Sequence, residues 1–135
     1  MSKIRTLNED KYNISKHRFK ELYYFCLQYD EWKDELKYKT DNLKSQELSN
    51  TPISHSNTSA VENLAIRRQQ LENKCKLIEQ TAMETDSELY QYIIKAVTNE
   101  YVTYKYLQTI MNIPCSRNTY YDRRRKFYYL LSKKI

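Results

Sequence analysis

The chain has 135 residues, of which 40% are hydrophobic, 13% aromatic and 30% charged, and it contains no glycine and two prolines. Its length favours one domain with a small core. The absence of glycine argues against a fold of short β-hairpins, because their favoured turns need residues at positive φ. We therefore expect an all-α protein, a helical bundle.

The net charge of +6 lies entirely in the last part of the chain. Of 23 basic and 17 acidic residues, seven and one fall in residues 116–135, which leaves sixteen of each in residues 1–115. A basic helix at one end of a neutral chain suits a polyanion better than it suits a small substrate.

The sequence predicts no metal, no cofactor and no membrane span. Cys26, Cys75 and Cys115 are widely spaced, and His17 and His55 belong to no cluster of ligands. Three reduced thiols fit a cytoplasmic protein. The polar N-terminus does not resemble a secretory signal, and no apolar run approaches the ~20 residues of a membrane helix.

Residues 1–42 are expected to form an N-terminal arm followed by one or two helices. Residues 1–14 are polar, and helix signals begin at Ser15. An apolar stripe with spacings of three, four and three then marks one helical face: Phe19, Leu22, Cys26 and Tyr29. A second helical stretch, with Asp30 as its candidate N-cap, should bury Trp32.

Residues 43–58 are rich in Ser, Thr and Asn and are predicted to form a flexible loop. A loop of this length is commonly mobile or ordered by a partner. Ser59 and Glu62 then form a capping box, which predicts the start of the longest helix. Residues 59–135 are expected to form a helical core, and the whole chain one domain.

The longest helix, at about residues 60–83, carries a heptad seam: Val61, Leu64, Arg68, Leu71, Cys75, Ile78 and Ala82. A seam of this kind needs a partner helix. The predicted helix at Lys16–Tyr29 of the same chain is one candidate, and a second copy in a coiled-coil homodimer is the other. The seam covers only about three heptads, so it fits both.

A second capping box, Thr85 with Glu88, predicts a further helix at about residues 86–99. Its apolar side chains cover much of its circumference, which indicates a central position in the domain. The main apolar face consists of Leu89, Ile93, Ala96 and Val97.

Residues 102–135 predict a helix–turn–helix. Thr103 can cap a first short helix, which should bury three side chains: Leu107, Ile110 and Met111. Asn112 suits the left-handed conformation at a helix end, and Pro114 prevents the helix from continuing. Ile113 is then expected to fill the angle between the two helices.

Ser116 is the expected N-cap of the last helix, which should run from Arg117 to about Ser132. Its inner face should present Tyr120, Phe127 and Leu131, with the stem of Arg124 in the same stripe. In a helix–turn–helix the opposite face enters the major groove, which gives five candidates for base contacts: Arg117, Asn118, Tyr121, Asp122 and Arg125. The candidates for phosphate contacts are Ser116, Thr119, Arg123, Lys126, Lys133 and Lys134.

The C-terminal segment resembles a known family in the helix that ends in Ile110 and Met111, in the turn at residues 112–114, and in the run at residues 116–121. It is similar there to the helix–turn–helix of small phage late-gene transcription activators of the ArpU and RinA type, and more distantly to the promoter-reading region of sigma factors. The resemblance covers roughly the last 35 residues and departs from the pattern at Asn112, where glycine is usual. It implies a prophage or mobile-element regulator of late or transfer genes.

We therefore expect a regulator of transcription that binds double-stranded DNA, with a homodimer supplying two half-sites and with RNA polymerase or another host protein as a further partner. A DNA-packaging protein like a small terminase subunit would read DNA in a similar way. A helical adaptor or inhibitor that binds a host protein is the alternative from another class. An enzyme is not expected, because the acidic residues are scattered among lysines and form no converging cluster.

Overall fold

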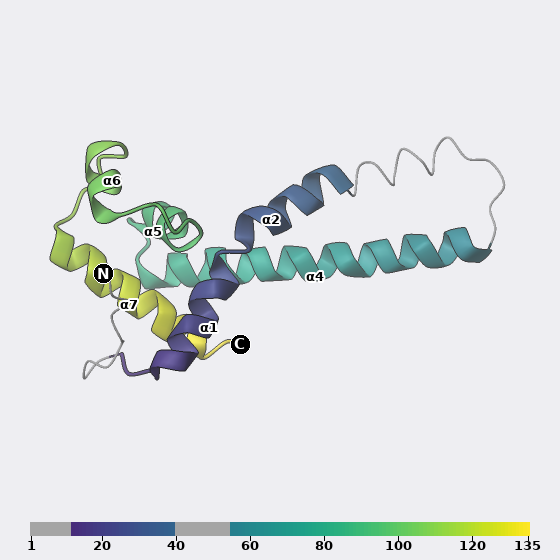
Figure 1. Ribbon diagram of the computed structural model, residues 1–135, viewed down its shortest axis with the longest axis horizontal. Helices are drawn as coiled ribbons and strands as arrows, with labels where there is room; N and C mark the ends of the chain where they lie inside the picture. The colour runs from purple at the N-terminus through teal and green to yellow at the C-terminus, as the bar shows by residue number, and fades with distance from the viewer. Residues whose placement is uncertain (1–11, 40–54) are drawn as a thin grey trace. The chain divides into compact units, whose positions relative to one another are not determined.

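The computed structural model describes residues 12–39 and 55–135, and the side chains of residues 12–38 and 59–135 (Figure 1). The predicted all-α fold is confirmed, since the part of the chain that the structure describes contains helices and no β-strand. The elements are α1 (Lys16–Cys26), α2 (Tyr29–Asp34), the π-helix η1 (Glu35–Lys39), α4 (His55–Thr85), α5 (Tyr90–Val97), α6 (Tyr104–Thr109) and α7 (Arg117–Ser132). The first eleven residues of the expected arm, and residues 43–54 of the expected loop, lie outside the described residues.

The chain divides into two compact units. The first joins residues 1–28 to residues 77–135, and the second consists of residues 29–76. The first unit therefore takes residues from both of the predicted ranges, 1–42 and 59–135. Helix α4 contributes its last turns to the first unit and its earlier turns to the second.

The core of the first unit forms where α1 and α5 pack against α7 (Figure 1). The stripe predicted for α1 is confirmed at its first three positions, which are fully buried, while Tyr29 lies in the next helix. Phe19 meets the ring of Tyr128 edge to face, with 4.9 Å between the ring centroids. The predicted faces of α5 and α7 are buried as well: Leu89, Ile93, Ala96, Val97, Tyr120, Phe127 and Leu131.

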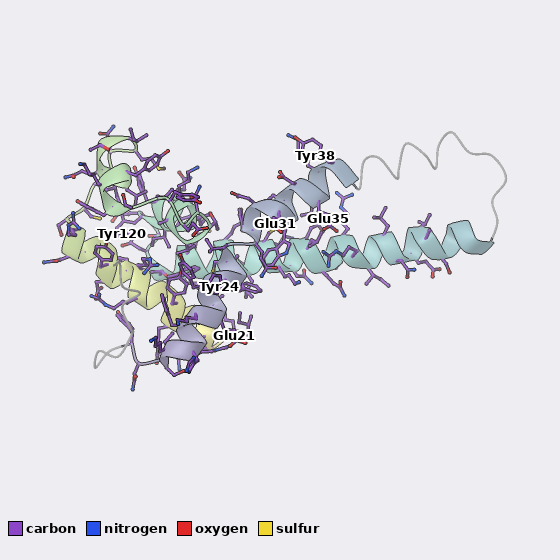
Figure 2. The ribbon with its side chains drawn as sticks, in the orientation of Figure 1. Glu21, Tyr24, Glu31, Glu35, Tyr38 and Tyr120 are labelled. Carbon is purple, nitrogen blue, oxygen red and sulfur yellow. The ribbon has the colours of Figure 1, made fainter. Side chains whose placement is uncertain are left out.

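The second unit is held by contacts between residues 29–38 and the earlier turns of α4. Arg67 donates two hydrogen bonds to the carboxylate of Glu35, at 2.8 and 3.1 Å. Figure 2 shows Glu35 on the side of η1 that faces α4, whereas Tyr38 points away from α4. Trp32 is buried, and the ammonium of Lys74 lies 5.1 Å from the centroid of its ring.

The heptad seam of α4 is buried only in part. Its last four members, from Leu71 to Ala82, are buried, whereas Val61 and Arg68 are exposed and Leu64 is half-buried. The partner for the earlier turns within the chain is the segment from residue 29 to residue 38, rather than the predicted helix at Lys16–Tyr29. The spacing alone could not choose between two neighbouring apolar segments.

Helix α4 begins at His55, so the predicted start at Ser59 is wrong and the loop is shorter than residues 43–58. Ser59 lies inside the helix, one turn after its beginning, and cannot act as its N-cap. Ser, Asn and Thr disfavour a helix interior by well under ~1 kcal/mol each, so a long helix extends through them at little cost.

The second predicted capping box is also wrong. Thr85 is the last residue of α4, and its hydroxyl donates back to the carbonyl oxygen of Thr81 at 2.8 Å. Asp86 instead holds the turn before α5, because its Oδ1 accepts from the backbone N–H groups of Glu88 and Leu89, and Leu89 is the N-cap of α5 without a side-chain cap. Helix α5 accordingly begins only at Tyr90.

The segment that leads to α7 follows the prediction closely. The hydroxyl of Thr103 accepts from the backbone N–H of Tyr106, and Asn112 has a φ of 55°, the left-handed conformation. Ile113 is buried, and its N–H donates to the carbonyl of Leu107 at 3.0 Å. The prediction was wrong for Ile110, which is 62% exposed because α6 ends at Thr109 and the chain turns away there.

Candidate nucleic-acid interface

Helix α7 has the predicted boundaries and the predicted cap. The hydroxyl of Ser116 accepts from the backbone N–H of Thr119 at 3.2 Å, and the helix then runs to Ser132. Two contacts with α6 support this start: the hydroxyl of Tyr104 donates to the carbonyl of Cys115 at 2.7 Å, and its ring lies 5.7 Å from that of Tyr120. These two contacts fix the first turn of α7 relative to α6.

The inner face of α7 is more aromatic than the sequence indicated. Besides the predicted Tyr120, Phe127 and Leu131, it buries Tyr128 completely. The guanidinium of Arg124 lies over two rings, 5.2 Å from the centroid of Tyr128 and 5.8 Å from that of Phe19. The stem of Arg124 thus lies on the inner stripe, as the spacing had predicted.

The five candidates for base contacts do not lie on one face. Asn118, Asp122 and Arg125 follow one another at spacings of four and three, so they share the outward side of the helix. Arg117 is exposed in the first turn, with its guanidinium 5.3 Å from the ring centroid of Tyr104. Tyr121 is half-buried, and its ring meets the edge of Tyr120, so it borders the inner face.

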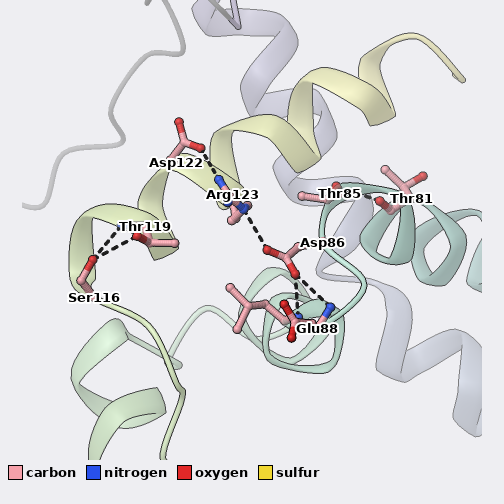
Figure 3. Close-up of polar contacts among 9 residues, drawn as sticks. Thr81, Thr85, Asp86, Glu88, Ser116, Thr119, Asp122 and Arg123 are labelled. Atoms are coloured by element: carbon pink, nitrogen blue, oxygen red, sulfur yellow. Dashed lines mark hydrogen bonds and ion pairs between the residues drawn. The ribbon is translucent and has the colours of Figure 1, made fainter.

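Arg123, a candidate for phosphate contacts, is bound within the protein (Figure 3). Its Nε donates to Asp86 Oδ2 at 2.8 Å, and its Nη1 donates to Asp122 Oδ2 at 2.7 Å. Burial by itself raises the pKa of Asp86, but the hydrogen bonds from Arg123 and from the backbone of Glu88 and Leu89 outweigh it, so the pKa lies below its usual value. This pair ties α7 to the turn between α4 and α5, and it leaves Arg123 less available to a phosphate.

Three other candidates for phosphate contacts also have partners within the chain. The hydroxyl of Ser116 donates to that of Thr119 at 3.1 Å, as Figure 3 shows. Lys134 pairs with Glu84, with 2.8 Å between its Nζ and the nearest carboxylate oxygen. A ligand would have to compete with these contacts, so these groups are weaker candidates than their positions in the sequence indicated.

Four cations of α7 and its C-terminal end have no carboxylate partner among the described residues: Arg117 and Lys133, which are exposed, and Arg125 and Lys126, which are half-buried. We call this set the outer basic face. Lys133 lies 4.6 Å from the ring centroid of Tyr129, a contact that leaves its charge in place. Of the seven cations in residues 116–135, Arg123 and Lys134 pair with carboxylates and Arg124 lies over rings of the inner face, while the other four make up the outer basic face.

Two of the three cysteine thiols have a raised pKa. Burial raises the pKa of the Cys26 thiol to about 12. At Cys115, burial and the nearby charge of Asp86 raise the pKa, although the residue stands just before a helix N-terminus. The described residues contain no group of three or more His, Cys, Asp or Glu side chains placed to hold a metal ion. No helix among them is long and apolar enough to cross a membrane.

Comparison with known proteins gives no relative for this chain: no protein family, no curated protein and no solved structure matches it.

Proposed function

We propose that the protein binds double-stranded DNA through the outer basic face of α7 and acts as a phage or mobile-element regulator of transcription. The observation that carries the proposal is the separation of charges along the chain. Residues 1–115 are neutral overall, and four cations near the C-terminal end, two exposed and two half-buried, have no carboxylate partner in the described structure. Cations gathered on one helix are typical of a surface that neutralises phosphates.

The side chains beside these cations can read bases. Arg117 and Arg125 can each donate two hydrogen bonds to guanine O6 and N7, and Asn118 can pair with adenine N6 and N7. A helix preceded by a tight turn and a shorter helix can enter the major groove with its first turns leading. Lys126 and Lys133 lie farther along the helix and would meet the sugar–phosphate backbone. The resemblance of this segment to phage late-gene activators agrees with the proposal.

Binding as a homodimer is part of the proposal, because one module of this size buries too little DNA surface for strong selectivity. The seam of α4 at residues 61–82 is the candidate contact. Its members from Leu71 to Ala82 are already buried within the chain, so a second copy would use the first turns, at Val61 and Leu64. A DNA-packaging role would use the same DNA-binding face.

The test is a fluorescence-anisotropy titration of a random duplex of about 30 base pairs at about 50 and about 200 mM salt. The variant Arg125→Glu/Lys126→Glu reverses two charges of the outer basic face. It is preferable to a change at Arg123, because a carboxylate at position 123 would face Asp86 and disturb the fold. We expect salt-sensitive binding by the wild type and at least a tenfold loss in the variant.

The matched control is Lys37→Glu/Lys76→Glu, which makes the same change in charge at two exposed positions of the other unit. It should keep most of the affinity for DNA. Equal losses in both variants would mean that only the net charge matters, and the face on α7 would be refuted. No binding by the wild type at low salt would refute DNA binding altogether.

A helical adaptor that binds a host protein is the second candidate. The observation in its favour is a group of exposed apolar side chains on and beside α6: Tyr101, Tyr106 and Ile110, of which Tyr101 is 83% exposed. Capture of a host protein that survives Arg125→Glu/Lys126→Glu and is lost in Tyr106→Ala/Ile110→Ala would favour the adaptor. Binding of DNA that is lost in Arg125→Glu/Lys126→Glu and kept in Tyr106→Ala/Ile110→Ala would favour the regulator.

A further inference from the structure

Asp122 is an acid in the middle of a basic surface. It is the one acidic residue between Ser116 and the C-terminal residue of the sequence, and it lies on the outward side of α7. Asn118 is four residues before it, Arg125 three after and Lys126 four after, so all three are its neighbours on the helix surface. A carboxylate at this place repels phosphates and lowers the affinity for any polyanion.

The carboxylate of Asp122 is held from one side. Arg123 Nη1 donates to its Oδ2 at 2.7 Å, and the same guanidinium is anchored through Nε to Asp86 Oδ2 at 2.8 Å. Asp86 is fixed in turn by the backbone N–H groups of Glu88 and Leu89, at 2.9 and 3.0 Å (Figure 3). The chain of contacts from Asp86 to Asp122 therefore restrains a surface side chain that would otherwise sample several rotamers.

The other oxygen of this carboxylate, Asp122 Oδ1, accepts no hydrogen bond within the described structure. An ionised carboxylate only accepts hydrogen bonds. In the major groove the exposed amino donors are cytosine N4 and adenine N6, and a lone carboxylate suits cytosine because adenine also presents the acceptor N7, which would repel it.

Resting on the proposed binding of DNA, we propose that Asp122 is a specificity-determining residue that accepts a hydrogen bond from a cytosine N4 amino group, and that Asp86 positions it through Arg123. The carboxylate lowers affinity for DNA in general and restores it where a cytosine lies opposite. It thereby increases the difference between specific and non-specific sites, which is the quantity that a regulator needs in a large excess of other DNA.

The test is selection from a pool of duplexes with a random central segment, followed by sequencing of the bound fraction. Wild type, Asp122→Ala and Asp122→Asn are compared, with Glu100→Gln as a control that removes one exposed negative charge of the same unit outside α7. Affinity for the unselected pool is measured in parallel. Circular dichroism confirms that each variant is folded.

We expect the wild type to select a motif with cytosine at one position, and Asp122→Ala to lose that preference about five- to tenfold while the rest of the motif remains. Asp122→Asn should change the preference there to adenine, because an amide can both accept from N6 and donate to N7. Affinity of both variants for the unselected pool should rise several-fold, whereas Glu100→Gln should change neither quantity.

Asp86→Asn provides the second readout. It keeps an acceptor for the backbone N–H groups but loses the ionic anchor of Arg123, so the cytosine preference should weaken without a change at other positions. An unchanged motif in Asp122→Ala would overturn the inference and leave DNA binding intact. A wild type that binds no duplex at low salt would overturn both.

Discussion

Tyr128 is fully buried, although the sequence did not place it on the inner face of α7. Position 128 lies eight residues after the buried Tyr120, and its ring fills the space between Phe19 and Phe127 at centroid distances of 4.9 and 5.2 Å. Burial raises the pKa of its phenol above the usual value. Its hydroxyl is buried without a hydrogen-bond partner among the described residues.

We predict that Tyr128→Phe leaves the free energy of unfolding unchanged or raises it by about 1 kcal/mol, because it removes a buried polar group that has no partner. Tyr104→Phe is the matched change, since that hydroxyl donates to Cys115. It should lower the free energy of unfolding by about 1 kcal/mol. Urea unfolding of the two variants measures both values, and an equal loss in both would contradict the prediction.

The lowered pKa of Asp86 predicts the sign of one contribution to the pH dependence of stability. Its pKa in the folded protein lies below the usual value of about 3.9, so its contribution to stability is present above that pH and is lost as the pH falls through the lower folded pKa. Asp86→Asn should cost roughly 1 kcal/mol at pH 7. The difference between variant and wild type should shrink below about pH 4 in urea unfolding. A difference that stays constant between pH 7 and pH 3 would exclude this origin.

At the scale of elements, the ends of the helices were harder to place than their faces. Thr103 and Ser116 were confirmed as caps because each hydroxyl accepts from a backbone N–H three residues later, and Ser15 caps α1 in the same way. Ser59 and Thr85 have the same local pattern but lie within or at the end of α4. A capping pattern only makes a helix start possible, and packing of the neighbouring turns decides whether the helix continues past it.

The turn between α6 and α7 depends on the backbone of Asn112, at a φ of 55°. This conformation raises the free energy of most residues by about 1 kcal/mol or more, whereas for glycine the increase is small. We predict that Asn112→Gly is neutral or slightly stabilising, that Asn112→Ala lowers the free energy of unfolding by about 1 kcal/mol and that Asn112→Val lowers it further. Thermal unfolding orders the three variants, and a tolerated valine would refute the need for the left-handed conformation.

At the scale of the whole molecule, the two units differ in how much they bury. The first contains most of the buried side chains, from α1, the last turns of α4, α5, α6, α7 and their connections, whereas the described part of the second buries Trp32, Leu71 and Cys75. Stability follows buried apolar area, so the smaller core should open at lower denaturant concentration. Trp32 is the one tryptophan of the chain and therefore reports on the second unit.

We predict that the fluorescence of Trp32 changes at a lower urea concentration than the near-ultraviolet circular dichroism of the buried tyrosines. Three of these, Tyr104, Tyr120 and Tyr128, belong to the first unit. The two signals measured on the same samples would then give separate midpoints, as expected when a protein does not unfold in one step. Coincident midpoints would mean that the units unfold together.

The sequence by itself determined the all-α class, the buried stripes of α1, α5 and α7, and both boundaries of α7, because these depend on local spacing, local caps and the absence of glycine. It also determined that the excess charge lies on the last helix. Only the tertiary structure decided which cations face solvent, which segment packs on the early turns of α4 and that Asp86 anchors Arg123. These depend on which residues distant in sequence meet in space, and a short period along the chain does not contain that information.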